Sequence, residues 1–336
     1  MGSQHKFTFE QEDRFMNPTE KDTLDTAKSA TQEATAVEND ATPQKPCPKK
    51  RKRRLGDRKE GRRLRSLDGL HTAMPFIMKD RSDACNTFAD EIEISKADIF
   101  VREQIMSGKE NFSMLHVILA AYVRTVAQYP YLNRFVSGQR IYSRNQLEII
   151  MTVKKEMNIK APETCIRVVF DPTDTVYDVY EKFNAELVKI ANDTGTDNVA
   201  GFFKKFPRLL FRATVKAIGW MDYWGLVPQA LMNALPFWGS MIITSMGSLG
   251  IKPIYHHLYN FGNLPIFVSY GTKRKVNEID KKGNVVSKKV IDMKVVTDER
   301  ICDGFEYATA FKAWKKHIEN PESLKLPPEH VVEDID

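Results

Sequence analysis

Two apolar runs near the C-terminus, and the charged turn that ends the second, restrict most strongly what this chain can fold into. Ile266–Gly271 and Val285–Thr297 are rich in β-branched and apolar residues, and Asp280–Asn284 between them has the Asp, Gly and Asn of a tight turn. This pattern predicts two strands joined as a hairpin. The second run ends in the turn Asp298–Gly304, which carries acids, an arginine and a glycine. Loops on a rigid scaffold often present functional side chains, so this turn is the first candidate for a functional site.

From about Leu67 onward the chain mixes strand and helix patterns. Alternation with period two predicts a strand at Asp90–Ser95, and a β-branched run predicts another at Thr164–Phe170. Ser113–Gln128 has apolar residues at helical spacing and a serine that can cap the helix. The other expected elements are a strand within 139–153, a helix at 176–190, a helix at 202–223, a strand at Met241–Thr244, a polar turn at Ser245–Gly250 and a helix at 305–318 that Pro321 ends.

The basic residues are concentrated in one segment. Between Lys49 and Arg65 there are 11 Lys and Arg against two acids, a local balance of +9, whereas the whole chain carries +6. Residues 1–66 are expected to be a disordered tail, because the part before the basic cluster has few large apolar residues. Residues 67–325 are then the folded domain, and 326–336 an acidic tail. The basic cluster can attract nucleic acid, anionic lipid or an import receptor, or it can be a solvated tail with weak polyanion or membrane-surface contacts.

Cysteine usage excludes two classes of small stabilised domain. The four cysteines lie far apart, with no C-x-x-C and no histidine at metal-ligand spacing. This argues against a disulfide framework and against a metal site, and it fits a cytoplasmic protein. The N-terminus also has no apolar signal-peptide core.

Two further segments leave alternatives open. Residues 224–251 carry no charge and are long enough to span a bilayer, but their Pro, Gly and polar residues favour buried core instead. The helix expected at 202–223 is basic and amphipathic. It can have a solvated face, or it can rest on a membrane or on a neighbouring subunit.

Four stretches in order resemble the catalytic domain of the 2-oxoacid dehydrogenase acyltransferases (dihydrolipoamide acyltransferases), whose fold is shared with chloramphenicol acetyltransferase. They are the helix and turn Ser113–Asn133, the strand and turn Ile243–Ile251, the strand Ile266–Lys275, and Asp298–Gly304, which is similar to the family signature D-H-R-x-x-D-G. The resemblance implies an α+β fold of two ferredoxin-like halves with a mixed sheet and flanking helices. It also implies a homotrimer whose active sites lie between subunits and take acyl-coenzyme A.

The resemblance assigns roles to residues of the turn. The position of the family's catalytic histidine is Glu299, which makes this glutamate the candidate general base. Asp303 matches the acidic or amide residue that positions the loop, and Asp298, Arg300 and Gly304 match the flanking residues of the signature. In the family the base takes a proton from a thiol, and the thiolate attacks a thioester carbonyl.

A hydroxyl from the neighbouring subunit donates to the oxyanion in the family mechanism. By position this donor is Ser245 or Ser248, with Thr244 as a third candidate. His256 and His257 are alternative bases, and Cys302 is either a nucleophile or a small packed residue.

The glutamate at position 299 makes the activity the open question. An ordinary glutamate has a pKa near ~4.3 and a thiol near ~8.5, so proton transfer is uphill by about 5–6 kcal/mol unless burial raises the carboxyl pKa. The first function hypothesis is an acyltransferase that moves an acyl group between coenzyme A and an acceptor thiol, hydroxyl or amine. The alternatives are a catalytically silent trimeric scaffold or regulatory relative, and a protein that binds membrane or nucleic acid through its basic cluster. The segment before Leu67 is too short and polar for a lipoyl domain, so a stand-alone catalytic-type domain is expected.

Overall fold

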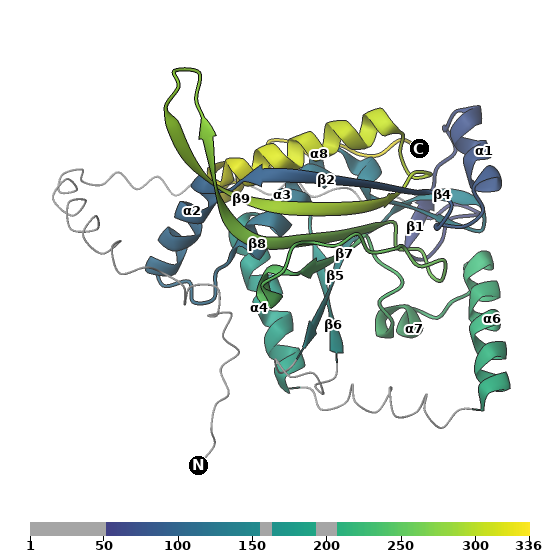
Figure 1. Cartoon of the computed structure of the whole chain (residues 1–336). Coiled ribbons are helices and arrows are strands. Elements are labelled where there is room, and N and C mark those ends of the chain that lie inside the picture. The colour runs from purple at the N-terminus through teal and green to yellow at the C-terminus, as the bar shows by residue number, and fades with distance from the viewer. Residues whose placement is uncertain (1–51, 155–162, 193–206) are drawn as a thin grey trace, which may run out of the picture.

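The computed structural model describes residues 52–154, 163–192 and 207–336 (Figure 1). The main sheet has six strands in the order β2-β9-β8-β7-β5-β6. In chain order they are β2 (Cys85–Glu93), β5 (Leu147–Lys154), β6 (Glu163–Phe170), β7 (Met241–Ser245), β8 (Ile266–Ile279) and β9 (Val285–Asp298).

A second, smaller sheet and a set of helices surround the main sheet. The small sheet consists of β1 (Gly61–Arg63), β4 (Arg140–Arg144) and β3 (Arg134–Ser137) in that order. The helices are α1 (Gly69–Ile77), α2 (Ser95–Met106), α3 (Met114–Gln128), α4 (Val176–Asn192), α6 (Arg208–Trp224), α7 (Gln229–Ala234) and α8 (Gly304–Glu319). Short 3-10 turns follow α3, β7 and α8, at Pro130–Asn133, Gly247–Leu249 and Pro321–Lys325.

The main sheet is mixed. Strand β7 runs parallel to both β5 and β8, whereas the β2/β9, β8/β9 and β5/β6 pairs are antiparallel. Strands β8 and β9 form the expected long hairpin, which extends beyond the rest of the sheet (Figure 1). The predicted α+β class, with a mixed sheet and flanking helices, is confirmed.

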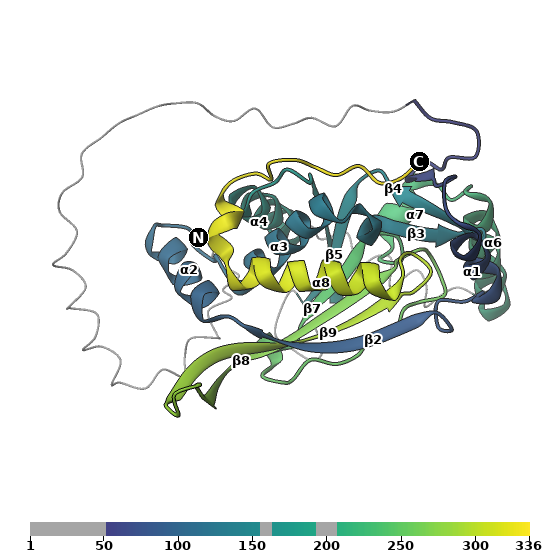
Figure 2. The same ribbon diagram turned by 90° about the horizontal axis from the view of Figure 1, so that it is seen from above.

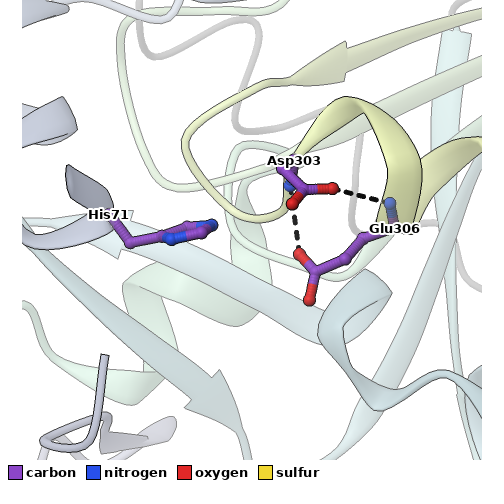
Figure 3. A group of neighbouring side chains, drawn as sticks. All are labelled: His71, Asp303 and Glu306. Atoms are coloured by element: carbon purple, nitrogen blue, oxygen red, sulfur yellow. Dashed lines mark hydrogen bonds between the residues drawn. The ribbon is translucent and has the colours of Figure 1, made fainter. Parts of the chain in front are cut away.

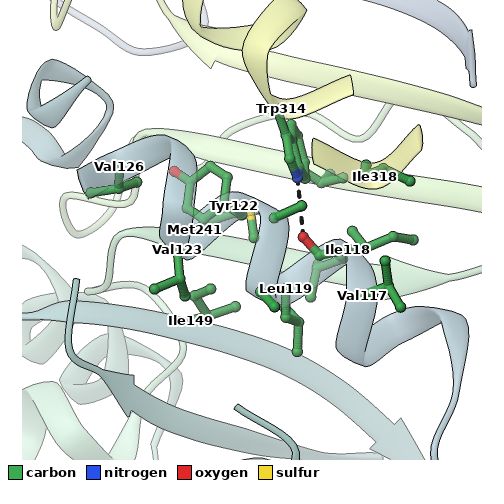
Figure 4. Packing of buried hydrophobic residues seen from close by; sticks show 14 of the residues in the cluster. Val117, Ile118, Leu119, Tyr122, Val123, Val126, Ile149, Met241, Trp314 and Ile318 are labelled. Carbon is green, nitrogen blue, oxygen red and sulfur yellow. Dashed lines mark hydrogen bonds between the residues drawn. The ribbon is translucent and has the colours of Figure 1, made fainter. Parts of the chain in front are cut away.

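Side chains of the central strands alternate between the two faces of the sheet, as the two-residue period requires. On β7, Met241 and Ile243 join the large core cluster, and Ile242 joins a smaller cluster on the other face. Helices α3, α4 and α8 lie together over one face (Figure 2). Nearly every residue of α3 is buried there, and the indole Nε1 of Trp314 on α8 donates to the Ile118 carbonyl oxygen at 3.0 Å (Figure 4).

Helix α3 begins where the sequence predicted. Ser113 is its N-cap, and the backbone N–H of Ser113 donates to Nδ1 of His116 at 3.0 Å. His116 is buried among aromatic rings, and this burial lowers its pKa to about 4. It is a packed histidine of the core.

Both expected tails contribute to the fold where they are described. Residues 1–51 lie outside the described residues, but the boundary expected at residue 67 comes too late, because β1 pairs with β4 and Arg58 is buried. The C-terminal segment 326–336 packs against the domain, and Arg134 forms a buried ion pair with Asp334 at 2.6 Å. Neither pairing leaves a local pattern in the sequence, because each joins segments far apart in the chain.

The expected strands and helices of the C-terminal half appear at nearly the expected bounds. The uncharged stretch 224–251 contains α7 and β7 rather than one continuous helix. Across the three described ranges, no helix combines the length and the apolar character needed to cross a membrane. Helix α6 corresponds to the basic helix expected at 202–223, of which residues 202–206 lie outside the described residues.

Candidate functional site

The turn between β9 and α8 is built around a buried ion pair. The Asp298 side chain is fully buried, and the guanidinium of Arg300 donates to both of its carboxylate oxygens, each at 2.7 Å. A second buried guanidinium, that of Arg81, lies 3.6 Å from Asp298. Burial lowers the pKa of Arg81, and the Asp298 charge opposes that shift. One buried carboxylate therefore compensates two buried cations.

The two arginines fasten the turn to other parts of the chain. Arg300 also donates to the carbonyl oxygens of Met78 and Lys79, at 2.9 and 3.1 Å, just after α1. Arg81 donates to the carbonyl oxygen of Val136 in β3 and to that of Tyr259 before β8. The turn is thus held from three directions, whereas the functional role of Asp298 and Arg300 stays a prediction.

Glu299 follows the buried aspartate at the end of β9. Its backbone N–H donates to the Ala84 carbonyl oxygen at 2.8 Å, which ties the turn to the start of β2. Its side chain is partly exposed, between the buried Asp298 and the buried Arg300. The backbone hydrogen bond holds Glu299 in place at the end of β9, and the side chain of this candidate base is accessible to solvent.

Asp303 and Gly304 begin α8. The Asp303 carboxylate accepts from the Glu306 backbone N–H at 2.7 Å, and the Glu306 carboxylate accepts from the Asp303 backbone N–H at 3.0 Å. This reciprocal capping box satisfies two backbone donors of the first helical turn. Asp303 therefore orders the loop and starts the helix, and its exposed side chain faces solvent beside the turn.

A histidine from a distant segment lies beside this helix start. His71 of α1 points toward the carboxylates of Asp303 and Glu306 (Figure 3), and one ligand-type atom from each of the three lies within 4.8 Å of the others. The carboxylate of Asp68, the N-cap of α1, contacts His71 twice. It accepts from the backbone N–H of His71 at 2.9 Å, and it lies 2.7 Å from the ring Nδ1 of His71. Both carboxylates already accept cap hydrogen bonds, so we assign no metal to this group.

His71 was not singled out from the sequence. Its signal was local and weak, an aspartate three residues before a histidine at the start of a nine-residue helix. Its proximity to Asp303 depends on how α1 packs, which no local pattern predicts.

The candidate oxyanion donors lie far from Glu299 within one chain. Ser245 pairs with Tyr270, which pairs with Met293, six residues before Glu299 on β9. At roughly 3.3 Å per residue this is about 20 Å along the sheet. Ser245 is buried at the end of β7, and the exposed Ser248 donates through Oγ to the Ser245 carbonyl oxygen at 3.0 Å. Thr244 is one residue earlier, so a single chain brings none of the three to Glu299.

The alternative bases and nucleophile are placed differently. Cys302 is buried in the core, and burial raises the pKa of its thiol, as expected of a packed residue. The ring of His256 stacks on Phe267 with centroids 4.0 Å apart, and His257 is exposed beside it. Both histidines lie in the connection that leads to β8.

Residues 238–326 match the family described as 2-oxoacid dehydrogenases acyltransferase (catalytic domain). The predicted resemblance to these acyltransferases is confirmed. The matched residues include both parts of the candidate site, namely Ser245 and Ser248 at and just after the end of β7, and the turn at Asp298–Gly304. No curated protein matches the chain.

Solved structures of acyltransferases are also similar to this chain. One described as a probable dihydrolipoamide acetyltransferase from Listeria monocytogenes has 14% identity and a TM-score of 0.48, covering 77% of this chain and 95% of its own. The cubic core of the pyruvate dehydrogenase multienzyme complex has 11% identity and a TM-score of 0.47, covering 77% and 89%. A chloramphenicol acetyltransferase has 12% identity and a TM-score of 0.47, covering 77% and 99%.

Proposed function

We propose that this protein is an acyltransferase that uses acyl-coenzyme A and acts as a homotrimer, with each site formed between two subunits. The observation that carries the proposal is the turn after β9, whose buried Asp298–Arg300 pair and capping Asp303 preserve the frame of the family signature around position 299. The match over residues 238–326 supports it, because the same segment supplies the serines after β7. The separation of these serines from Glu299 within one chain is what a site between subunits requires.

The chemistry follows from the residue types. A base on the turn takes the proton of the acceptor, the acceptor attacks the thioester carbonyl, and the coenzyme A thiolate leaves. The hydroxyl of Ser245 or Ser248 from the neighbouring subunit donates to the oxyanion of the tetrahedral intermediate. The acceptor is a thiol, a hydroxyl or an amine.

His71 gives the site a second candidate base beside Glu299. An imidazole is a stronger base than a carboxylate, so a histidine accepts a thiol proton at a smaller free-energy cost than a glutamate does. Its hydrogen bond to Asp68 fixes which ring nitrogen faces the carboxylates of α8. This orientation of an imidazole by a carboxylate is the arrangement that general bases use.

Coenzyme A release by the purified full-length protein tests the proposal. Acetyl-coenzyme A and longer acyl chains would be offered with a dithiol, an alcohol and an amine, and the free coenzyme A formed would be separated and quantified, because the total thiol does not change when the acceptor is itself a thiol. We expect turnover with at least one acceptor. His71→Asn and Glu299→Gln separate the two bases, and the correct one lowers kcat by roughly 10²–10⁴. Ser287→Ala, on the distal half of the β8/β9 hairpin, is the matched control and leaves the rate unchanged.

The silent scaffold is the second candidate, and the glutamate at the histidine position favours it. If no acceptor yields free coenzyme A, and Glu299→His does not create activity, the acyltransferase proposal is rejected in favour of the scaffold.

The cytoplasmic location expected from the cysteines is part of the proposal, and the described cysteines Cys85, Cys165 and Cys302 form no disulfide.

A further inference from the structure

Helix α6 has an apolar face that the rest of the described chain leaves exposed. None of its 17 residues is buried. Leu209, Trp220 and Trp224 share one face of the helix, because they are separated by 11 and 4 residues. Their exposed fractions are 82%, 61% and 61%. Ile218 and Met221, on the other side of the helix, pack against the small cluster around Trp238.

The same outward side of α6 also carries basic residues. Arg208, Arg212 and Lys216 follow one another at four-residue spacing, so they form a stripe along the helix that continues into Trp220 and Trp224. The only acidic residue of the helix, Asp222, faces the domain, where it accepts from the indole Nε1 of Trp238 at 2.7 Å. The outward surface of α6 therefore combines aromatic and aliphatic side chains with positive charge.

The basic N-terminal segment meets α6 at its C-terminal end. The guanidinium of Arg58 donates to the carbonyl oxygens of Asp222 and Tyr223 at 2.5 and 2.7 Å. The exposed basic residues around Arg58 are Lys52, Arg53, Arg54 and Lys59, and Leu55 between them is also exposed. Figures 1 and 2 place β1 and α6 at the same end of the molecule.

We propose that α6, together with the basic segment at residues 52–59, binds the surface of an anionic phospholipid bilayer. When Trp and Leu lie beside Lys and Arg on the outward side of a helix, the apolar side chains can enter the membrane interface while the long basic side chains reach the lipid headgroups. The basic segment adds the second signal that stable attachment of this kind needs. None of these residues belongs to the proposed acyl-transfer site, and the test does not depend on activity.

The charge of both elements favours a membrane over a two-fold contact with a second copy of the chain. A two-fold contact would bring identical basic elements toward one another, and the acids of these elements, Asp57 and Asp222, already have partners within the chain in Arg65 and Trp238. An anionic bilayer supplies both the negative surface and the apolar layer.

Tryptophan fluorescence with lipid vesicles tests the proposal directly. The chain has four tryptophans, and Trp238 and Trp314 are each only 1% exposed, so a change on binding reports Trp220 and Trp224. We expect the full-length protein to co-sediment with vesicles that contain phosphatidylglycerol, with a blue shift of its emission. Vesicles of phosphatidylcholine alone should bind it far more weakly, and high salt should weaken the binding to the anionic vesicles.

Separate substitutions of the apolar and of the basic residues of α6 sharpen the test. The double variant Leu209→Gln with Trp220→Gln is expected to lower vesicle affinity by about tenfold or more. The variant Arg212→Gln with Lys216→Gln should lose affinity for anionic vesicles selectively. The matched control removes two equally exposed apolar groups elsewhere, Met106→Gln on α2 and Ile279→Gln at the hairpin, and keeps full binding.

Three results would overturn the proposal. Binding without a blue shift would leave the basic segment as a simple polyanion contact and remove α6 from the surface. Dissociation of the oligomer by Leu209→Gln with Trp220→Gln, measured by light scattering, would make this face a subunit interface. Equal binding of the control and α6 variants would show that exposed apolar groups act without regard to place.

Discussion

At the scale of single residues, Asp298 decides the shape of the candidate site. Its carboxylate is the only acidic group that an ion pair joins to Arg81 or Arg300 in the described part of the chain, and all three side chains are buried. Removing one member of such a group leaves an uncompensated buried charge, which is more costly than the pair itself is stabilising.

Asp298→Asn is therefore expected to lower the free energy of unfolding by about 3–5 kcal/mol, because two buried guanidinium groups lose their counter-charge. Chemical denaturation measures this change. Asp90→Asn is the control, since Asp90 is exposed and pairs with Lys315 at the surface, where ion pairs contribute little. Equal effects of the two variants would contradict the role given to Asp298.

The buried His116 gives the fold a pH dependence. Its pKa is about 4 in the folded protein, against ~6.5 for an ordinary histidine, so below pH 6.5 the unfolded chain binds the proton more readily. Its contribution to stability is complete above about pH 6.5 and is lost between about pH 6.5 and 4, by about 3 kcal/mol.

His116→Gln should flatten this part of the stability curve. Denaturation midpoints of both proteins from pH 7.5 to 4.5 measure the difference between them. Because burial also lowers the pKa of His317 to about 4, the variant keeps a residual slope. Parallel curves for the two proteins would exclude His116 as the source.

At the scale of elements, local patterns predicted most of the fold that positions the site. Helix α3, strand β6, the β8/β9 hairpin and the start of α8 were all predicted, because periodicity and caps are written in neighbouring residues. The turn at 298–304 was predicted for the same reason.

What the sequence could not predict depends on contacts between distant segments. Arg81 reaches Asp298 across more than 200 residues, and β1 becomes a strand only by pairing with β4. His71 became a candidate only when the packing of α1 placed it near Asp303. Single charged residues of this kind have no periodicity to reveal their partners.

The C-terminal segment gives a test at this scale. Asp334→Asn should lower the melting temperature clearly, because Arg134 is 4% exposed and would lose its counter-ion inside the protein. Glu329→Gln changes an exposed acid of the same segment and should have little effect. If both variants melt like the wild type, the segment is a dispensable acidic tail.

At the scale of the whole molecule, the proposed site lies between subunits. Ser245 at the end of β7 and the turn after β9 lie about 20 Å apart along the sheet, so the proposal needs a neighbouring subunit to bring them together. The most direct test is complementation between two inactive variants. One variant lacks the base, as Glu299→Gln or, if His71 is the base, as His71→Asn. The other is the double variant Ser245→Ala with Ser248→Ala. Each is purified alone, and the two are then mixed, dissociated and reassembled. We expect that neither variant releases coenzyme A alone. We also expect that about a quarter of all sites in a random equimolar mixture regain activity, which is one site in each mixed trimer, where the intact base meets the intact serines. Mixtures that stay as inactive as their components, while the wild type is active, would contradict a site shared between subunits.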